Sequence, residues 1–321
     1  MIKVGIIGGA GFTGGELLRL LVNHPEAEVA FVHSNSQKGK PVASVHKDLK
    51  GEIDLEFEQK EPPPLDLLFL CLGHGKTREY LKQQPVQSNT RIIDLSDDFR
   101  ISYPGNPFVY GLPELNRDRL KTADKVANPG CFATAIQLAL LPLAANSLMS
   151  HEIHVHAVTG ATGAGAGLLS TTHFSWRQNN LSVYKAFEHQ HLAEIRQSLE
   201  QAGGSPFPEI NFIPVRGDFT KGIFCTAYTA VDGSLNQFQK IYGEYYQDHL
   251  FTVVSEEPIS LKEVINTNKC YLHLQYHRGK LLVTSIIDNL IKGASGQAVQ
   301  NMNLMFRLPE STGLKLKATG F

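Results

Sequence analysis

The sequence predicts an α/β fold with a Rossmann-type doubly wound parallel sheet, joined to an α+β domain with a mixed or antiparallel sheet. In the first third of the chain, short continuous apolar runs alternate with helical segments, which is the pattern of parallel βαβ units. From about residue 150, strand-like segments instead alternate apolar and polar residues, as half-exposed strands do. A length of 321 residues is enough for two domains.

The first domain is expected to begin with residues 3–8, KVGIIG, a strand that is apolar on both faces. The segment GGELLRLLVNH that follows has helical apolar spacing. Three further strands are predicted at residues 27–34, 65–73 and 90–96, the second of them introduced by the breaker EPPP.

The second domain is expected to contain strands at residues 152–159 and 222–231, and a hairpin that turns at His277-Arg278-Gly279-Lys280. Helical spacing returns near the end, in GQAVQNMNLMFRL, and this helix is expected to pack on the first domain. We therefore expect one domain made of residues 1–130 and 293–321, and another made of residues 131–292.

Composition narrows the class of protein. The net charge is -1, with 42% hydrophobic and 19% charged residues, so neither a nucleic-acid partner nor a membrane surface is expected. The chain opens directly on a strand, which argues against a signal peptide. The four cysteines are dispersed and form no CxxC pair, so we expect no disulfide framework, no metal site, and a cytoplasmic location.

A glycine-rich turn lies between the first strand and the first helix. Gly8, Gly11 and Gly14 have G-x-x-G-x-x-G spacing, which lets the backbone approach a pyrophosphate at a helix N-terminus. Similar turns also occur without a nucleotide. The strand–loop–helix context favours a dinucleotide.

The end of the second strand indicates which dinucleotide. An NAD site usually carries an Asp or Glu there, but this chain reads VHSNSQKGK. Ser34 and Ser36 offer hydroxyls, and Lys38 and Lys40 offer positive charge, which favours the 2′-phosphate of NADP. The alternative is a polar loop with two solvated lysines.

One cysteine has a setting that suits reaction. Cys131 follows the turn Asn-Pro-Gly and opens a helical segment, where the helix dipole stabilises a thiolate. The alternative is an inert core residue. Cys71, Cys225 and Cys270 are expected to be core residues within strands.

A nucleophilic thiol needs a base and a group that orients the base. His191 and Glu194 are three residues apart and would share a helix face, and His189 lies just before that helix. The alternative is a solvated helix start.

Several long motifs together carry a resemblance. They run in order from residue 8 to residue 314: GGAGFTGGELLRLL, IIDLSDDFR, YGLPELNR, NPGCFATA, TGATGAGAG, HQHLAEI, DNLIKGASGQAVQNMNLM and LPESTGL. In these motifs the chain resembles the N-acetyl-γ-glutamyl-phosphate reductases, the arginine-biosynthesis family of the semialdehyde-dehydrogenase superfamily. The resemblance implies NADPH-dependent reduction of an N-acyl-γ-glutamyl phosphate to the semialdehyde, through a cysteine thioester, by a homo-dimer or homo-tetramer.

The resemblance also implies roles for individual residues. Cys131 would be the nucleophile, and His191, with His189 and Glu194, would serve acid–base and orienting roles. The cofactor would be held at the pyrophosphate and near the nicotinamide by Gly8, Gly11, Phe12, Thr13, Gly14, Gln297 and Asn301. Ser96 and Arg100 would line the site near the substrate phosphate.

One segment departs from the family pattern. Members usually carry Pro-His-Leu-x-Pro-x-x-Arg-Gly-Ile, whereas this chain reads INFIPVRGDFTKGIF, with Asn211 where His is common and an insertion around RGDF. Arg216 or Lys221 could supply the cation that binds substrate. The insertion also motivates the hypothesis that the acyl group is succinyl rather than acetyl.

Three rival functions remain. A lysine-pathway N-acyl-aminoadipyl-phosphate reductase would act on a substrate one methylene longer, and a pocket distinguishes one methylene by only about 1–3 kcal/mol. Aspartate-semialdehyde dehydrogenase shares the mechanism, but its motifs fit less well. A non-catalytic NADP-binding protein would lack the nucleophile. The loop TGATGAGAG could serve a subunit contact or the active site.

Overall fold

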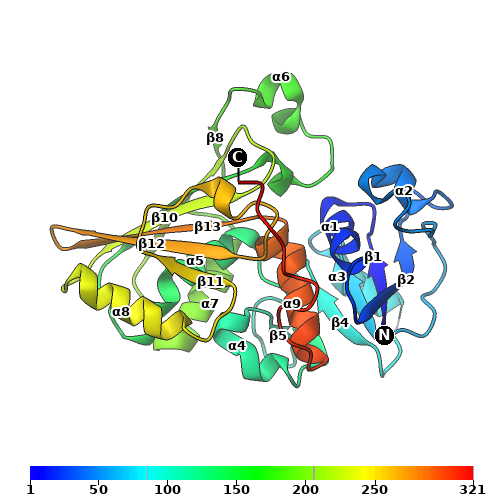
Figure 1. Cartoon of the computed structure of the whole chain (residues 1–321), viewed down its shortest axis with the longest axis horizontal. Helices are drawn as coiled ribbons and strands as arrows, with labels where there is room; N and C mark the ends of the chain where they lie inside the picture. The colour runs from blue at the N-terminus through cyan, green and yellow to red at the C-terminus, as the bar shows by residue number, and fades with distance from the viewer. Residues whose placement is uncertain (85, 205–206, 321) are drawn as a thin grey trace. The chain divides into compact units, whose positions relative to one another are not determined.

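The computed structural model describes residues 1–84, 86–204 and 207–320, and its contacts divide the chain into two compact units (Figure 1). The first unit comprises Met1–Pro129 and Ala294–Lys315, and the second Gly130–Gly293 and Leu316–Phe321. Sequence analysis had placed residue 130 and the whole of 293–321 in the first domain. By its contacts, the structure groups Gly130, Gly293 and the residues after Lys315 with the second unit.

The first unit contains a six-stranded parallel sheet in the order β2-β1-β3-β4-β6-β5. The strands are β1 (Ile2–Ile7), β2 (Ala27–His33), β3 (Leu67–Leu70), β4 (Arg91–Asp94), β5 (Val109–Tyr110) and β6 (Lys125–Ala127). The four strands predicted from apolar runs are present. The sequence analysis missed β5 and β6, because two or three residues carry no readable periodicity.

The strand order reverses at β1, because β2 and β3 pair with its opposite sides. In such sheets the crevice at the carboxyl end of the reversal point is where ligands bind. Gly8 follows β1 and Cys71 follows β3, and the two backbones approach so closely that a Cβ on Gly8 would lie 2.5 Å from the carbonyl oxygen of Cys71.

Cys71 is therefore not the mid-strand core residue that the sequence suggested. The strand ends at Leu70, and half-buried Cys71 lies just beyond it, with its amide donating to the carbonyl of Ile7 at 2.8 Å. Burial raises the pKa of the Cys71 thiol to about 12, so the thiol stays protonated at neutral pH.

The helices of the first unit are α1 (Phe12–Leu21), α2 (Val42–Val45), α3 (Lys76–Gln83), α4 (Pro113–Leu120) and α9 (Gly296–Met305). Every residue of α9 is buried, and the helix contacts α1, α4 and β4. Glu310 fixes the segment after α9 through an ion pair with Arg117 and a hydrogen bond that it accepts from Gln300, each at 2.8 Å. The C-terminal helix is thus part of the first unit's core, as predicted.

The second unit contains a seven-stranded mixed sheet in the order β11-β12-β13-β10-β7-β9-β8. Its strands are β7 (Ile153–Thr159), β8 (Ser182–Val183), β9 (Ile210–Arg216), β10 (Ile223–Ala230), β11 (Thr252–Ser255), β12 (Cys270–His277) and β13 (Lys280–Ile287). The predicted hairpin is β12–β13. Its two turn residues, Arg278 and Gly279, have φ values of 48° and 75°, as a type I′ turn requires.

Helices cover one face of this sheet. They are α5 (Cys131–Ala145), α7 (His191–Gly203) and α8 (Leu235–Tyr246), while the short α6 (Phe174–Arg177) lies in a loop region. Helix α5 contacts β10, β12 and β13 on the sheet side and also touches α7 and α8. Alternate residues of β7, namely Ile153, Val155 and Ala157, are buried, as one covered face predicts. None of the described helices is long and apolar enough to span a bilayer.

A proline inside α5 leaves one backbone carbonyl without its usual helical hydrogen bond, and a tyrosine of another helix donates to it instead. Pro142 has no amide hydrogen, so the carbonyl of Leu138 loses its helical partner. The hydroxyl of buried Tyr246, on α8, donates to that oxygen at 2.6 Å. Tyr242 donates likewise to Ala139 at 2.6 Å. The hydrogen bond that Pro142 cannot donate within α5 is therefore replaced by one from Tyr246, which attaches α8 to α5.

We expect Tyr246→Phe to destabilise the second unit by about 1–3 kcal/mol, because the Leu138 carbonyl would stay buried without a donor. Urea unfolding followed by circular dichroism measures the change. Tyr228→Phe is the control, since Tyr228 is 42% exposed, and a change below about 0.5 kcal/mol is expected there. Equal stability of Tyr246→Phe and wild type would contradict this account of the helix contact.

Candidate functional site

The glycine-rich turn has the shape that a pyrophosphate site needs. Gly8 has a φ of 81°, and a Cβ on Gly14 would lie 2.6 Å from the Cα of Gly9. Helix α1 begins at Phe12 with Gly11 as its N-cap, and among the described residues no side chain caps this end. The first turn carries no acidic residue. The backbone amides and the helix dipole therefore suit an anionic group, and the turn fits the phosphates of a dinucleotide.

A histidine that sequence analysis missed holds this turn in place. His46 Nε2 donates to the carbonyl oxygen of Gly9 at 2.8 Å. The same ring packs on Gly15, where an added Cβ would lie 2.6 Å from the ring atom Cε1. His46 lies 37 residues beyond Gly9 in the sequence, outside any recognisable motif, so no local pattern could have indicated the contact.

We expect His46→Ala to raise KM for NADPH about tenfold with little change in kcat, because one hydrogen bond that shapes the phosphate loop is lost. Steady-state kinetics at varied NADPH measures the effect. His46→Gln retains a donor and should recover much of the affinity. A fall in kcat at unchanged KM would show that His46 acts elsewhere.

The residues predicted to hold the 2′-phosphate follow β2. Ser34 is buried and its hydroxyl lies 3.5 Å from that of Ser36, while Lys38 is exposed. Lys40 is exposed too, and its ammonium donates to Gln37 at 3.0 Å. Because β2 is the neighbour of β1, these side chains lie at the same carboxyl edge as the glycine-rich turn.

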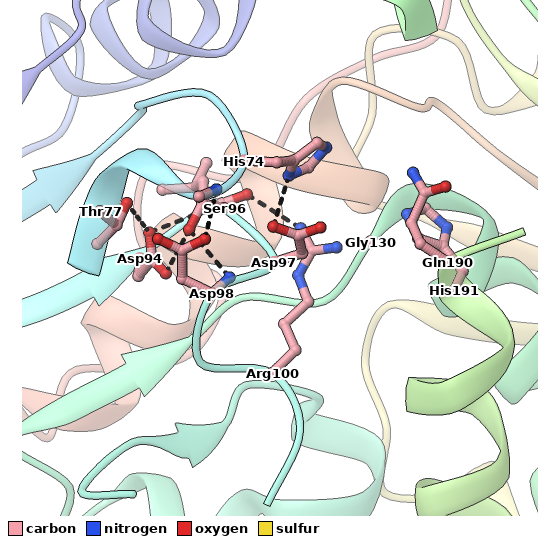
Figure 2. Close-up of polar contacts among 12 residues, drawn as sticks. His74, Thr77, Asp94, Ser96, Asp97, Asp98, Arg100, Gly130, Gln190 and His191 are labelled. Atoms are coloured by element: carbon pink, nitrogen blue, oxygen red, sulfur yellow. Dashed lines mark hydrogen bonds and ion pairs between the residues drawn. The ribbon is translucent and has the colours of Figure 1, made fainter. Parts of the chain in front are cut away.

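A polar cluster binds together the loops that follow β3 and β4 (Figure 2). Asp94 is fully buried and accepts bonds from Thr77 at 2.9 Å and from the Ser96 hydroxyl at 2.8 Å. Burial raises the pKa of Asp94, and these hydrogen bonds offset only part of the rise. Asp98 accepts from the amides of Gly75 and Arg78 and so caps the start of α3.

This cluster changes the expected role of Ser96. Its hydroxyl hydrogen is directed to Asp94, and its oxygen accepts from the amide of Asp98 at 3.2 Å. Ser96 therefore fixes the shape of this loop, and its place near the substrate phosphate stays a prediction. Arg100, also nearly buried, donates from Nε to the carbonyl of Asn128 at 2.9 Å and from Nη2 to Leu95 at 3.0 Å.

The two residues predicted on α9, Gln297 and Asn301, are fully buried. Asn301 Nδ2 donates to the carbonyl of Gly111 at 2.8 Å and to Asn128 Oδ1 at 3.1 Å. Asn128 in turn donates to the carbonyl of Ala294 at 3.0 Å. Asn301 thus links the YGLPELNR and NPGC motifs to the C-terminal helix.

In the second unit, Cys131 is the first residue of α5, as predicted, and Gly130 is its N-cap. Cys131 is half-buried. Gly293 packs against it so closely that a Cβ on Gly293 would lie 2.7 Å from the Cβ of Cys131. The thiol therefore lies where the amides and dipole of a fifteen-residue helix stabilise negative charge.

The predicted histidine–glutamate pair lies directly beside this helix start. His191 opens α7, and its Nε2 lies 3.8 Å from Glu194 Oε1. Glu194 Oε2 accepts from the amide of Gly130 at 3.1 Å. A Cβ on Gly130 would lie only 2.4 Å from His191 Nε2, and Figure 2 shows the two residues side by side. His189 is also buried, and its Nδ1 accepts from the amide of His191 at 3.2 Å.

Tyr184 joins this cluster, although no motif pointed to it. Its ring centroid lies 5.8 Å from that of His189, and the guanidinium carbon of Arg216 lies 4.5 Å from it. Burial raises the pKa of Tyr184 to about 12, the charge of Cys131 adds to the rise, and Arg216 lowers it only in part. The phenol therefore stays protonated beside Arg216 and near Cys131.

The structure separates the two cations that sequence analysis could not choose between. Arg216 lies in the cluster with Tyr184 and His189. Lys221 instead donates to Asn266 Oδ1 at 3.4 Å. Its charge also lowers in part the pKa of Asp288, which burial raises. No group of three metal-ligating side chains was found among the described residues.

Comparison with known proteins identifies the family. Residues 3–123 match the NAD-binding domain of semialdehyde dehydrogenases, and residues 131–289 match their dimerisation domain. The chain is 56% identical over its full length to an N-acetyl-gamma-glutamyl-phosphate reductase of Christiangramia forsetii, and 55% identical to one of Parabacteroides distasonis, with all of each relative covered.

Solved structures share the fold. Aspartate semialdehyde dehydrogenase II of Vibrio cholerae, complexed with ASA, is similar with a TM-score of 0.72 at 15% identity, over 96% of this chain and 98% of that one. The Candida albicans enzyme with NADP gives 0.74 at 14% identity, over 95% and 98%. At these identities the likeness concerns the fold alone. The full-length relatives and the two family matches establish that the chain belongs to the N-acetyl-gamma-glutamyl-phosphate reductase family of semialdehyde dehydrogenases.

Proposed function

We propose that the protein catalyses the NADPH-dependent reduction of N-acyl-γ-glutamyl phosphate to N-acyl-glutamate 5-semialdehyde and phosphate, in arginine biosynthesis. The observation that carries the proposal is the junction at Gly130, which joins the helix start bearing Cys131 to the His191–Glu194 pair. The full-length identity to relatives named for this reaction supports it.

The first step forms a bond to sulfur. The Cys131 thiolate attacks the acyl carbon of the substrate, the bond between that carbon and the phosphate oxygen breaks, and phosphate leaves. A thioester on Cys131 results. The N-terminus of α5 favours the thiolate that this step needs.

The second step moves a proton at His191. The bound cofactor supplies a hydride equivalent for the thioester carbonyl. His191 protonates the oxygen of the resulting thiohemiacetal and takes that proton back as the carbon–sulfur bond breaks, which releases the aldehyde and the thiolate. Glu194 orients the imidazole and is itself held by the Gly130 amide. His189 contacts the His191 ring, Tyr184 contacts His189, and Arg216 lies over the ring of Tyr184, so these three residues line the same site.

The first unit would hold the cofactor, and the chemistry of its residues favours NADP. The amides around Gly8, Gly11 and the Phe12–Gly14 turn would bind the pyrophosphate. Ser34, Ser36 and Lys38 would bind the 2′-phosphate, since no carboxylate follows β2 in residues 34–40. Gln297 and Asn301 would support the nicotinamide end, with Asn301 acting through the Gly111–Asn128 network.

Two arginines would bind the charged groups of the substrate. Arg216, in the cluster with Tyr184 and His189, would bind the carboxylate end of the substrate, and Lys221 would not. Arg100 would serve the phosphate, with Ser96 fixing the loop that carries it. The dimerisation-domain match supports self-association, as a homo-dimer or homo-tetramer. We place the enzyme in the cytoplasm, acting on a small molecule and not on nucleic acid.

The reverse reaction tests the proposal and avoids the unstable acyl phosphate. The protein is mixed with N-acetyl-glutamate semialdehyde, phosphate and NADP, and NADPH formation is followed by absorbance. We expect a rate that requires phosphate. The N-succinyl semialdehyde, run in parallel, determines the acyl preference. No NADPH from either compound, with cofactor binding shown separately, would contradict the proposal, and the aminoadipyl homologue would then be tested.

A further inference from the structure

A long loop of the second unit carries an apolar surface that the proposed reaction does not use. We call residues 161–183 the arm. It leaves the sheet after β7, contains α6, and returns at β8, the edge strand of the sheet. Figure 1 shows α6 and β8 on an extension at one end of this unit.

The arm is fixed by the RGDF insertion, residues 216–219, whose role the sequence left open. The nearly buried guanidinium of Arg177 donates to the carbonyl of Arg216 at 2.7 Å and to the Ser182 hydroxyl at 3.0 Å. Asp218 accepts from the amide of Asn179. At the other end, the amide of Ala161 donates to Phe219 at 2.7 Å. The insertion thus holds the arm at both ends.

The side chains that the arm presents to solvent are large and apolar. Leu168 is 101% exposed, Phe174 74% and Leu181 64%, with Leu169 and Trp176 also exposed. Leu168, Leu169, Thr172, His173 and Trp176 border a hollow, and the exposed Phe174 directly follows His173 of that border in the sequence. Concentrated apolar exposure of this kind marks an interaction surface.

The near absence of charged side chains on the arm limits the kind of partner that it can bind. Residues 161–183 contain no Asp, Glu or Lys, and their one arginine, Arg177, is directed inward by its hydrogen bonds. Such a surface offers nothing to nucleic acid or to an anionic membrane, and it matches a partner that is itself apolar and uncharged. A second copy of the arm has this character.

We propose that the arm is a self-association surface, in which the arms of two copies meet about a two-fold axis and Phe174 of each copy fills the hollow of the other. The arm lies inside residues 131–289, the part of the chain that matches the dimerisation domain. A two-fold contact uses the same patch on both subunits, so a protruding ring beside a hollow makes the arm complementary to itself. The inference rests on the self-association part of the proposed function.

The test compares assembly masses. Leu168→Glu with Phe174→Glu places two charges in the contact, and Leu250→Glu places one at a 61% exposed leucine elsewhere in the unit. Sedimentation velocity over a hundredfold range of concentration gives the dissociation constant of each protein. We expect the arm variant to dissociate at least tenfold more readily than wild type, and the Leu250 variant to match wild type. Asp218→Asn, which weakens the anchor, should shift the constant in the same direction.

Three outcomes would overturn the inference, and the first two differ in whether self-association itself is also lost. A wild-type protein that is monomeric at every concentration would remove the proposed self-association as well. A wild-type oligomer whose arm variant has the same dissociation constant would remove only the arm. Hydrogen exchange gives a second readout, since dilution of the wild type should deprotect the amides of residues 168–176. Unchanged protection after full dissociation would also contradict the inference.

Discussion

Cys131→Ala is expected to lower kcat for the phosphate-dependent reaction by about 10⁴-fold or more, as removal of a nucleophile does in other covalent mechanisms. The physical reason is that alanine at the first position of α5 can form no thioester, so reduction would have to occur on the acyl phosphate directly. That carbonyl would lack the covalent attachment to Cys131, which holds the substrate at the helix start beside the His191–Glu194 pair. Coupled absorbance assays at saturating NADP measure the change.

The control for this prediction is another thiol. Cys225→Ala changes a fully buried strand residue, and burial raises the pKa of that thiol, so it is expected to keep activity within a few-fold. The affinity of Cys131→Ala for NADPH, measured by fluorescence, should equal that of wild type. Residual activity within tenfold of wild type in Cys131→Ala would exclude the thioester route.

A single methyl group at Gly130 is expected to lower kcat by about 100-fold. An alanine Cβ there would lie 2.4 Å from His191 Nε2 and 2.7 Å from Glu194 Oε1, so the pair must move. A displacement of about 1 Å in a catalytic group can cost that factor. The backbone itself is not strained by the change, because Gly130 has φ −72° and ψ 151°, which alanine adopts.

Gly243→Ala is the matched control for Gly130→Ala. Gly243 lies within α8, and a Cβ there meets nothing within 4 Å. This variant should keep its activity and gain up to about 1 kcal/mol of stability from helix propensity. The pH profile of kcat separates a displaced imidazole from general misfolding, because only the former changes its acidic limb. Wild-type kcat in Gly130→Ala would refute the arrangement described at this junction.

The fold followed from the sequence where elements were long and periodic. Strands β1, β2 and β4 are apolar runs, and β12–β13 has the turn chemistry of a hairpin, so both sheets could be anticipated. Cys71 was misplaced, because an apolar run does not show where backbone pairing stops. The π-helical turn Ile291–Ser295 before α9 has no sequence signal at all.

The site was predictable only where its members are neighbours in sequence. The pair His191 and Glu194 follows from helical spacing, and the setting of Cys131 follows from the turn before it. His46 and Tyr184 were missed because they reach the site through tertiary packing. Ser96 shows what a motif leaves out, because nothing in the sequence indicated that the hydrogen of its hydroxyl would go to Asp94.

The division of the chain into units also sets an order of events during synthesis. The bulk of the second unit, Gly130–Gly293, is continuous, but the first unit needs both Met1–Pro129 and Ala294–Lys315. A ribosome adds about 5–20 residues per second, so the segment Met1–Pro129 waits on the order of ten seconds for the last helix of its unit. During that time the surfaces of α1, α4 and β4 that α9 will cover are exposed. The unit that contains the first strands to be synthesised is therefore the last to finish folding. We expect chaperones that bind nascent chains to engage its exposed surfaces until α9 emerges.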